Sequence, residues 1–77
     1  MKELIEEIVA HLVDYPEQVS VTEVEGENSK ILELRVAKSD LGKVIGKEGR
    51  IAKAMRVLLS AATSREQKKC NLEIVED

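Results

Sequence analysis

The sequence has almost no aromatic residues: Tyr15 is the only one among 77 residues, and phenylalanine and tryptophan are absent. Some nucleic-acid-binding folds, such as RRM sheets and many OB folds, hold bases by stacking them on aromatic side chains. This chain lacks the residues for such a platform. Any contact with a base must therefore come from aliphatic or polar groups.

Cysteine and histidine are equally scarce, with one of each, Cys70 and His11. A single cysteine excludes an internal disulfide, and one cysteine with one histidine cannot build a structural zinc site. We expect Cys70 to be buried as a small hydrophobic residue and His11 to lie at the surface. With no nucleophile–base pair and no metal-binding set, we expect no cofactor, no metal and no enzyme activity.

Long hydrophobic runs are also missing. No apolar stretch approaches the roughly 18 residues of a membrane span, and the acidic amino terminus does not resemble a signal peptide. We therefore expect a cytoplasmic protein. The chain is 43% hydrophobic and 35% charged, which is ordinary for a small globular fold, and its length predicts one domain over residues 1–77.

The charges that are present are unevenly distributed. Residues 1–29 carry a net charge of −7, residues 30–69 carry +7, and residues 70–77 carry −3. A basic middle between acidic ends is what a localised phosphate-binding face would produce, although a charged run can also be a solvated helix face.

Hydrophobic periodicity predicts six elements. Residues 2 to about 13 form an amphipathic helix, and residues 19–22 and 31–36 form a hairpin with a polar loop at 25–29. A short helix over about 40–45, capped by Ser39 or Asp40, precedes a longer helix over about 50–63. After a polar connector at 64–69, Cys70, Leu72 and Ile74 alternate as a last strand. The hairpin is antiparallel, and the last strand should lie parallel to the second.

The two helices in the middle of the chain meet at a pair of glycines with GxxG spacing, Gly46 and Gly49. Glycine lets the backbone turn sharply and approach a ligand without a Cβ, and a helix start directs unpaired N–H groups at an anion. Such a pair is weak on its own, but here apolar and basic residues surround it. Gly42, which we interpret as a packing or helix-entry glycine, does not complete a dinucleotide motif, and there is no P-loop.

The element order and residues 42–54 resemble a type II KH domain, in which a GxxG loop joins two helices. The resemblance covers essentially the whole chain. More narrowly, the length, the acidic first helix and the glycine run are similar to the small stand-alone bacterial KH proteins of the KhpA type. The implied fold class is α+β, of order α-β-β-α-α-β, with a three-stranded mixed sheet packed on three helices.

The resemblance also implies a function and a site. It implies binding of single-stranded RNA, with about four unpaired nucleotides in the groove. It further implies a role as a post-transcriptional regulator or RNA chaperone linked to cell elongation and division. The implied RNA-binding residues are Lys43, Ile45, Gly46, Lys47, Glu48, Gly49, Arg50 and Lys53. Leu41, Val44 or Ile45 would form an aliphatic floor for bases, whereas the negative charge of Glu48 would oppose the phosphate.

The implied partners beyond RNA are a second copy of the chain and a larger KH-containing protein. This leaves an alternative, a protein-interaction adaptor that uses the KH surface for homodimerisation or heterodimerisation and binds RNA only weakly. Residues 50–63 are our predicted dimer surface, because Val57 and Ala61 lie partly off the core side of that helix.

Overall fold

The first helix, α1, spans Lys2–Ala10 in the computed structural model, which describes residues 2–63 and 69–76. Ile5 and Val9, one helical turn apart, are buried on its inner side. The helix ends three residues earlier than the sequence predicts. His11 and Leu12 donate backbone hydrogen bonds to the carbonyls three residues before them, so the last turn tightens. The apolar pattern continues past this end because Val13 packs against the core from the loop.

The next segments form the predicted hairpin. A short helical turn, η1 (Pro16–Gln18), leads into β1 (Ser20–Glu25), which pairs antiparallel with β2 (Ser29–Arg35). Both strands extend into the loop predicted at 25–29. Glu25 lies opposite Lys30, and their side chains form an ion pair with an Nζ–Oε1 distance of 3.6 Å. Glu25, which was predicted to lie in the loop, thus belongs to a cross-strand pair, and only residues 26–28 remain in the turn.

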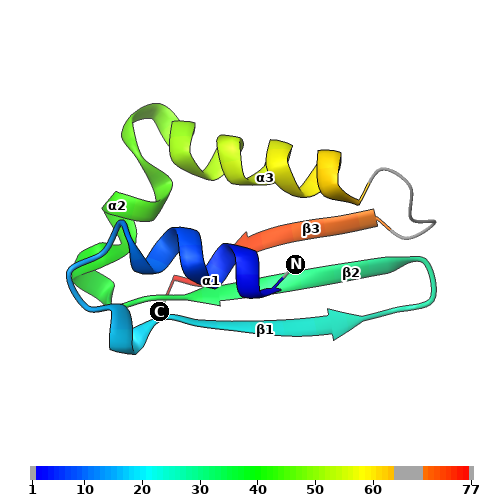
Figure 1. The fold of residues 1–77 in the computed structure, drawn as a ribbon, viewed down its shortest axis with the longest axis horizontal. Helices are drawn as coiled ribbons and strands as arrows, with labels where there is room; N and C mark the ends of the chain where they lie inside the picture. Colours follow the sequence, from blue (N-terminus) through cyan, green and yellow to red (C-terminus); the bar gives the residue numbers. More distant parts are fainter. Residues whose placement is uncertain (1, 64–68, 77) are drawn as a thin grey trace.

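The last strand, β3 (Lys69–Ile74), pairs parallel with β2, so the sheet order is β1-β2-β3. Between β2 and β3 the chain forms η2 (Lys38–Asp40), α2 (Leu41–Ile45), η3 (Lys47–Gly49) and α3 (Arg50–Ala62). Figure 1 shows the axes of α1 and α3 running roughly along the direction of the strands. The α+β fold class, the α-β-β-α-α-β order and the mixed sheet are all confirmed. The predicted connector at 64–69 falls largely outside the described residues.

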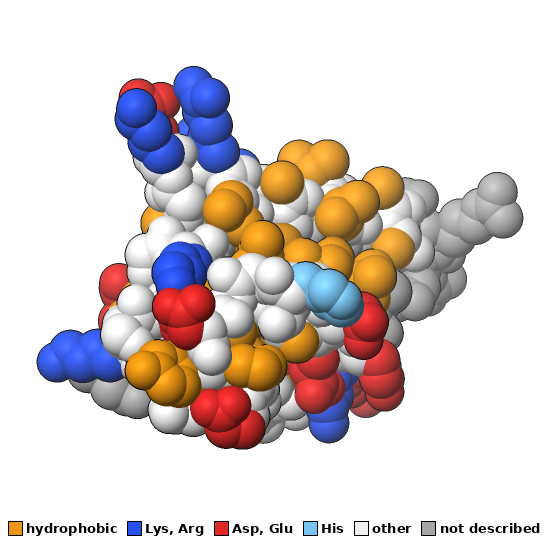
Figure 2. All heavy atoms as spheres, turned by 60° about the vertical axis from the view of Figure 1, so that its left-hand side comes forward, with side chains coloured by type: hydrophobic (Ala, Val, Ile, Leu, Met, Phe, Trp, Pro, Cys, Tyr) orange, Lys and Arg blue, Asp and Glu red, His pale blue; other side chains and the backbone are white. Residues whose placement is uncertain are grey.

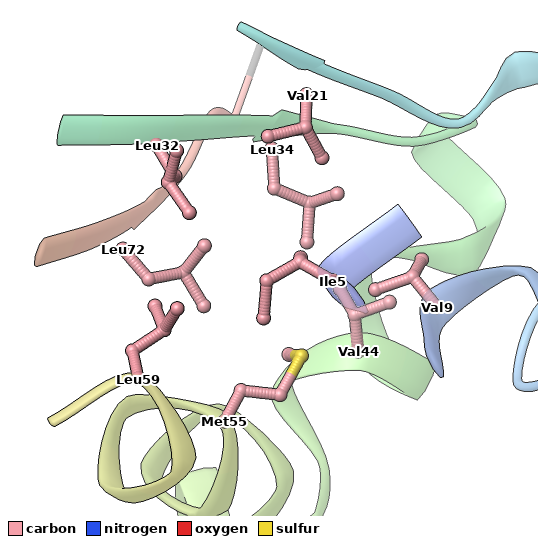
Figure 3. Close-up of a cluster of buried hydrophobic side chains, with 9 residues drawn as sticks. All are labelled: Ile5, Val9, Val21, Leu32, Leu34, Val44, Met55, Leu59 and Leu72. Carbon is pink, nitrogen blue, oxygen red and sulfur yellow. The ribbon is translucent and has the colours of Figure 1, made fainter. Parts of the chain in front are cut away.

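The core lies between the sheet and the helices, as Figure 3 shows. Its buried side chains come from α1, all three strands, α2 and α3: Ile5, Val9, Val21, Leu32, Leu34, Val44, Met55, Leu59 and Leu72. Cys70 is half-buried and packs against this cluster, on the same face as Leu72, as its alternation predicts. Within the described residues, no helix is long and apolar enough to cross a bilayer.

The buried carboxylate of Asp40 ties the loop after α1 to the start of α2. Its side chain is fully buried, and its Oδ1 and Oδ2 accept hydrogen bonds from the backbone N–H groups of Asp14 (3.2 Å) and Tyr15 (3.1 Å). The sequence predicts Ser39 or Asp40 as a helix cap. Asp40 does occupy the N-cap position of α2, but its side chain makes no capping hydrogen bond there. Its oxygens face the loop instead.

We expect Asp40→Ala to lower the free energy of unfolding by about 1–3 kcal/mol, because it leaves two partly buried N–H groups without an acceptor. Urea denaturation followed by circular dichroism measures this change. The exposed neighbour Ser39 supplies the control, since Ser39→Ala should change stability by at most about 0.5 kcal/mol. Equal stability of the two variants would contradict the anchoring role.

Candidate nucleic-acid interface

The glycine loop is a tight turn between α2 and α3 at one end of the molecule (Figure 1). Helix α2 ends at Ile45, and Gly46 then adopts φ 79° and ψ 171°. Gly49, with φ 74°, lies in the left-handed region and immediately precedes α3. The N–H of Gly49 donates to the carbonyl of Gly46 at 3.1 Å, which closes the turn. The predicted placement of a GxxG loop between two helices is therefore confirmed.

The two glycines are needed for different reasons. A Cβ on Gly46 would lie 2.7 Å from Cγ1 and 3.0 Å from Cβ of Ile51, so a larger residue there would clash with α3. A Cβ on Gly49 would meet no atom within 4 Å, so its requirement is the positive φ alone. Because Gly49 has no side chain, it cannot cap α3, and the first-turn amides of the helix lack a side-chain partner at that position. Such a helix start favours an anion.

Glu48 is the residue of the loop least suited to phosphate. It is the one described residue other than glycine with a positive φ, 59°, a conformation that L-residues adopt at some cost. Its carboxylate pairs with Arg50, with an Oε2–Nη2 distance of 3.5 Å, and both side chains are mostly exposed. The pair holds a negative charge beside the loop and partly neutralises Arg50.

The predicted basic residues differ in how far neighbouring carboxylates offset their positive charges. Lys47, Arg50 and Lys53 are exposed, and Figure 2 shows basic side chains projecting from the end of the molecule that carries the loop. Arg50 is paired with Glu48, and Lys43 pairs with two carboxylates, directly with Asp14 and at 3.8 Å with Asp40. The hydrogen bond to Asp14 and both negative charges raise the pKa of Lys43 above its ordinary value. Its charge is therefore largely balanced within the protein.

A groove of about 280 Å³ begins at the loop and runs beside α3 toward the end of β3. Its lining residues are Ile45, Gly49, Ala52, Lys53, Arg56, Ile74 and Glu76. Of the three residues predicted as an aliphatic floor, Ile45 lines the groove. The prediction for Val44 is wrong, because Val44 is fully buried in the core, and Leu41 is half-buried outside this lining.

Sequence reasoning missed four of the lining residues: Ala52, Arg56, Ile74 and Glu76. Helical spacing in the sequence could have identified two of them, because Ala52 and Arg56 follow Gly49 at positions that lie on its side of α3. Ile74 and Glu76 lie at the far end of β3, and only the tertiary fold brings them to the loop.

A second hollow, of about 330 Å³, lies between α1 and η1 and is lined by Glu3, Glu6, Glu7, Ala10, Pro16 and Val19. Its three carboxylates would repel a phosphate backbone. Among residues 2–63 and 69–76, no group of three or more histidine, cysteine or acidic side chains is arranged to hold a metal ion. The glycine loop and its groove are therefore the arrangement best suited to nucleic acid.

Comparison with known proteins places the chain in a family. The KH-domain family model described as KhpA/KhpB matches residues 2–74. The RNA-binding protein KhpA of Clostridium perfringens is 59% identical over 75 residues, which cover 97% of this chain and all of that protein. The RNA-binding protein KhpA of Chlamydia trachomatis is 54% identical over 77 residues, which cover this whole chain and 99% of that protein. No solved structure matches the chain.

The loop geometry makes Gly46→Ala and Gly42→Ala a matched pair. We expect Gly46→Ala to lower the free energy of unfolding by about 1–3 kcal/mol, because its Cβ meets Ile51 and its φ is unfavourable. Gly42 lies within α2, and a Cβ there would meet nothing within 4 Å, so Gly42→Ala should be neutral or stabilise by up to about 1 kcal/mol. Thermal denaturation compares the two. A stable Gly46→Ala protein would contradict the close approach.

Proposed function

This chain belongs to the KhpA/KhpB family of KH domains, and from that membership we propose that it is an RNA-binding protein acting through its glycine loop. The resemblance inferred from the sequence is thereby confirmed. The family is not one of enzymes, so the prediction that this chain is not an enzyme is confirmed as well. The proposed ligand is single-stranded RNA, bound as about four unpaired nucleotides by a single domain over residues 1–77.

The observation that carries the proposal is the continuity of the glycine loop with the groove. Phosphates would lie against the backbone at Gly46 and Gly49, where no Cβ keeps them away. The bases would then lie over the apolar surface formed by Ile45, Ala52 and Ile74. Because the groove is lined by aliphatic rather than aromatic side chains, the bases would gain burial without stacking on rings.

The charges beside this path predict a modest affinity. Lys47, Arg50 and Lys53 would contribute attraction to the phosphates, with a smaller contribution from Lys43, whose charge is balanced by two carboxylates. Glu48 lies in the loop itself and would oppose them. Few net phosphate contacts mean that affinity should fall with added salt, but with a shallow slope.

The biological role belongs to the proposal too. Relatives named RNA-binding protein KhpA match over almost their whole length, which supports a shared role for this chain. That role is a cytoplasmic post-transcriptional regulator or RNA chaperone, linked through the family resemblance to cell elongation and division. A larger KH-containing protein is the proposed partner, which fits the joint naming of the family.

A specific surface supports the second candidate function, pairing with another protein. Val57 and Leu58 on α3 are 66% and 47% exposed, and Leu4 on α1 is 42% exposed. Figure 2 shows hydrophobic side chains gathered along α3. Exposed apolar surface of this kind favours association, and a homodimer would place two RNA-binding loops in one particle. Pairing and RNA binding are compatible.

Changing Lys47 and Glu48 together to Asp tests RNA binding. We expect the double variant to lose measurable affinity for short single-stranded RNA, because it replaces the attraction of Lys47 by repulsion at the loop. Fluorescence anisotropy measures the affinity, and circular dichroism and thermal denaturation should show a folded protein, since both side chains are exposed. Unchanged RNA affinity in a folded variant would refute the proposed site.

Sedimentation analysis of Val57→Glu tests the pairing surface. We expect the wild-type chain to form a dimer and this variant to weaken it by about tenfold or more, because a buried charge at an interface is costly. Val24 on β1 is a matched control: it is also exposed, at 48%, and Val24→Glu should leave the dimer intact. A wild-type chain that stays monomeric at high concentration would argue against this candidate.

A further inference from the structure

Two oppositely charged side chains, Arg56 and Glu76, lie in the groove away from the glycine loop. Arg56 is two helical turns beyond Gly49 on α3, and Glu76 follows the end of β3. Neither is needed to hold a phosphate at the loop. A carboxylate in this position disfavours a phosphate and favours a group that donates hydrogen bonds.

Arg56 is held by the backbone of the neighbouring strand. Its Nε and Nη2 both donate to the carbonyl oxygen of Leu72, each at 3.4 Å. These distances exceed the usual range of about 2.7–3.2 Å, so the bonds are weak and a ligand could replace them at little cost. The guanidinium therefore has a preferred orientation while its other N–H groups remain donors.

The Leu72 carbonyl lies on the open edge of the sheet. Lys69 and Val75 donate their backbone N–H groups to carbonyls of Asn28 and Leu34, on the β2 side. In a parallel ladder these bonds recur at every second residue, so Leu72 and Ile74 direct their backbone polar groups away from β2. The open edge of β3 and Arg56 thus border the groove together.

We propose that Arg56 and Glu76 make the groove selective for guanine at one nucleotide position. This inference rests on the proposed RNA binding. Guanine has two adjacent acceptors, O6 and N7, which match the fork of an arginine guanidinium. Its Watson–Crick edge has the donors N1–H and N2–H, whose hydrogen bonds a carboxylate accepts.

The other bases fit this pair less well. Adenine has one acceptor beside a donor on its major-groove edge, and cytosine likewise has a donor amine where guanine has O6. Uracil has acceptors but no second donor beside its ring N–H, and so offers less to Glu76. Guanine alone satisfies a two-acceptor contact and a two-donor contact at once.

Short uridine oligonucleotides with one guanosine, moved through successive positions, test the selectivity. Fluorescence anisotropy at fixed salt gives the ratio of affinities for each guanosine oligonucleotide and the all-uridine one. We expect guanosine at one position to bind roughly tenfold to a hundredfold more tightly, the discrimination typical of a good two-bond base contact. Inosine, which lacks the N2 amine, and deazaguanosine, which lacks N7, should each lose part of that gain.

Three variants assign the contacts. Arg56→Lys keeps the positive charge but has no forked guanidinium to bind O6 and N7 together. The affinity for the guanosine oligonucleotide should therefore fall to that for the all-uridine one. Glu76→Gln should remove most of the difference between guanosine and inosine. The control is Arg35→Lys: Arg35 is an exposed arginine at the end of β2, outside the groove lining, and this variant should keep the wild-type ratio.

The outcomes separate this inference from the proposed function. Binding of every oligonucleotide without a preference for guanosine would overturn the inference and leave RNA binding in place. A guanosine preference that survives Arg56→Lys and Glu76→Gln would also overturn the assignment. If the wild-type chain bound none of the oligonucleotides, both the inference and the proposed RNA binding would fall.

Discussion

The close approach of Ile51 to the backbone of Gly46 is the constraint on which the candidate site depends. Ile51, in the first turn of α3, packs against the core, while Gly46 directly follows α2, whose Val44 belongs to that core. The missing Cβ at Gly46 lets the two helices meet through a turn of only a few residues. The chain then has to pass through positive φ at Glu48 and Gly49, and the backbone of this turn is left exposed where α3 begins.

Charge pairing within the protein sets the strength that the site can reach. Lys43 balances Asp14 and Asp40, and Arg50 is paired with Glu48, so two of the basic residues near the loop already have anionic partners. The +7 charge of the central segment already includes Asp40 and Glu48, and Asp14 from the acidic amino-terminal segment offsets it further. This arrangement suits weak, reversible binding of RNA. A dimer that presents two such loops would bind RNA more tightly than either loop alone.

Periodicity in the sequence predicts the element order and most of the core, because inward positions on strands and helices repeat at fixed spacing. The Val21 and Leu72 positions follow that rule. Asp40 does not: a polar residue before a helix reads as a cap, and only the tertiary fold brings the distant backbone of residues 14–15 to its carboxylate. For the same reason, the sequence predicts only part of the groove lining. Helical spacing places Arg56 on the same side of α3 as Gly49, whereas only the tertiary fold brings Glu76, near the end of the chain, to the groove.

The central claim is that RNA lies along the glycine loop and the groove beside α3. Backbone amide chemical shifts, recorded by NMR while a short single-stranded RNA is added to the wild-type chain, test it most directly. The account predicts that the largest changes fall on residues 45–53 and on Arg56 and Ile74, with little change on α1. Changes confined to α1 or to β1, with the loop amides unmoved, would contradict it.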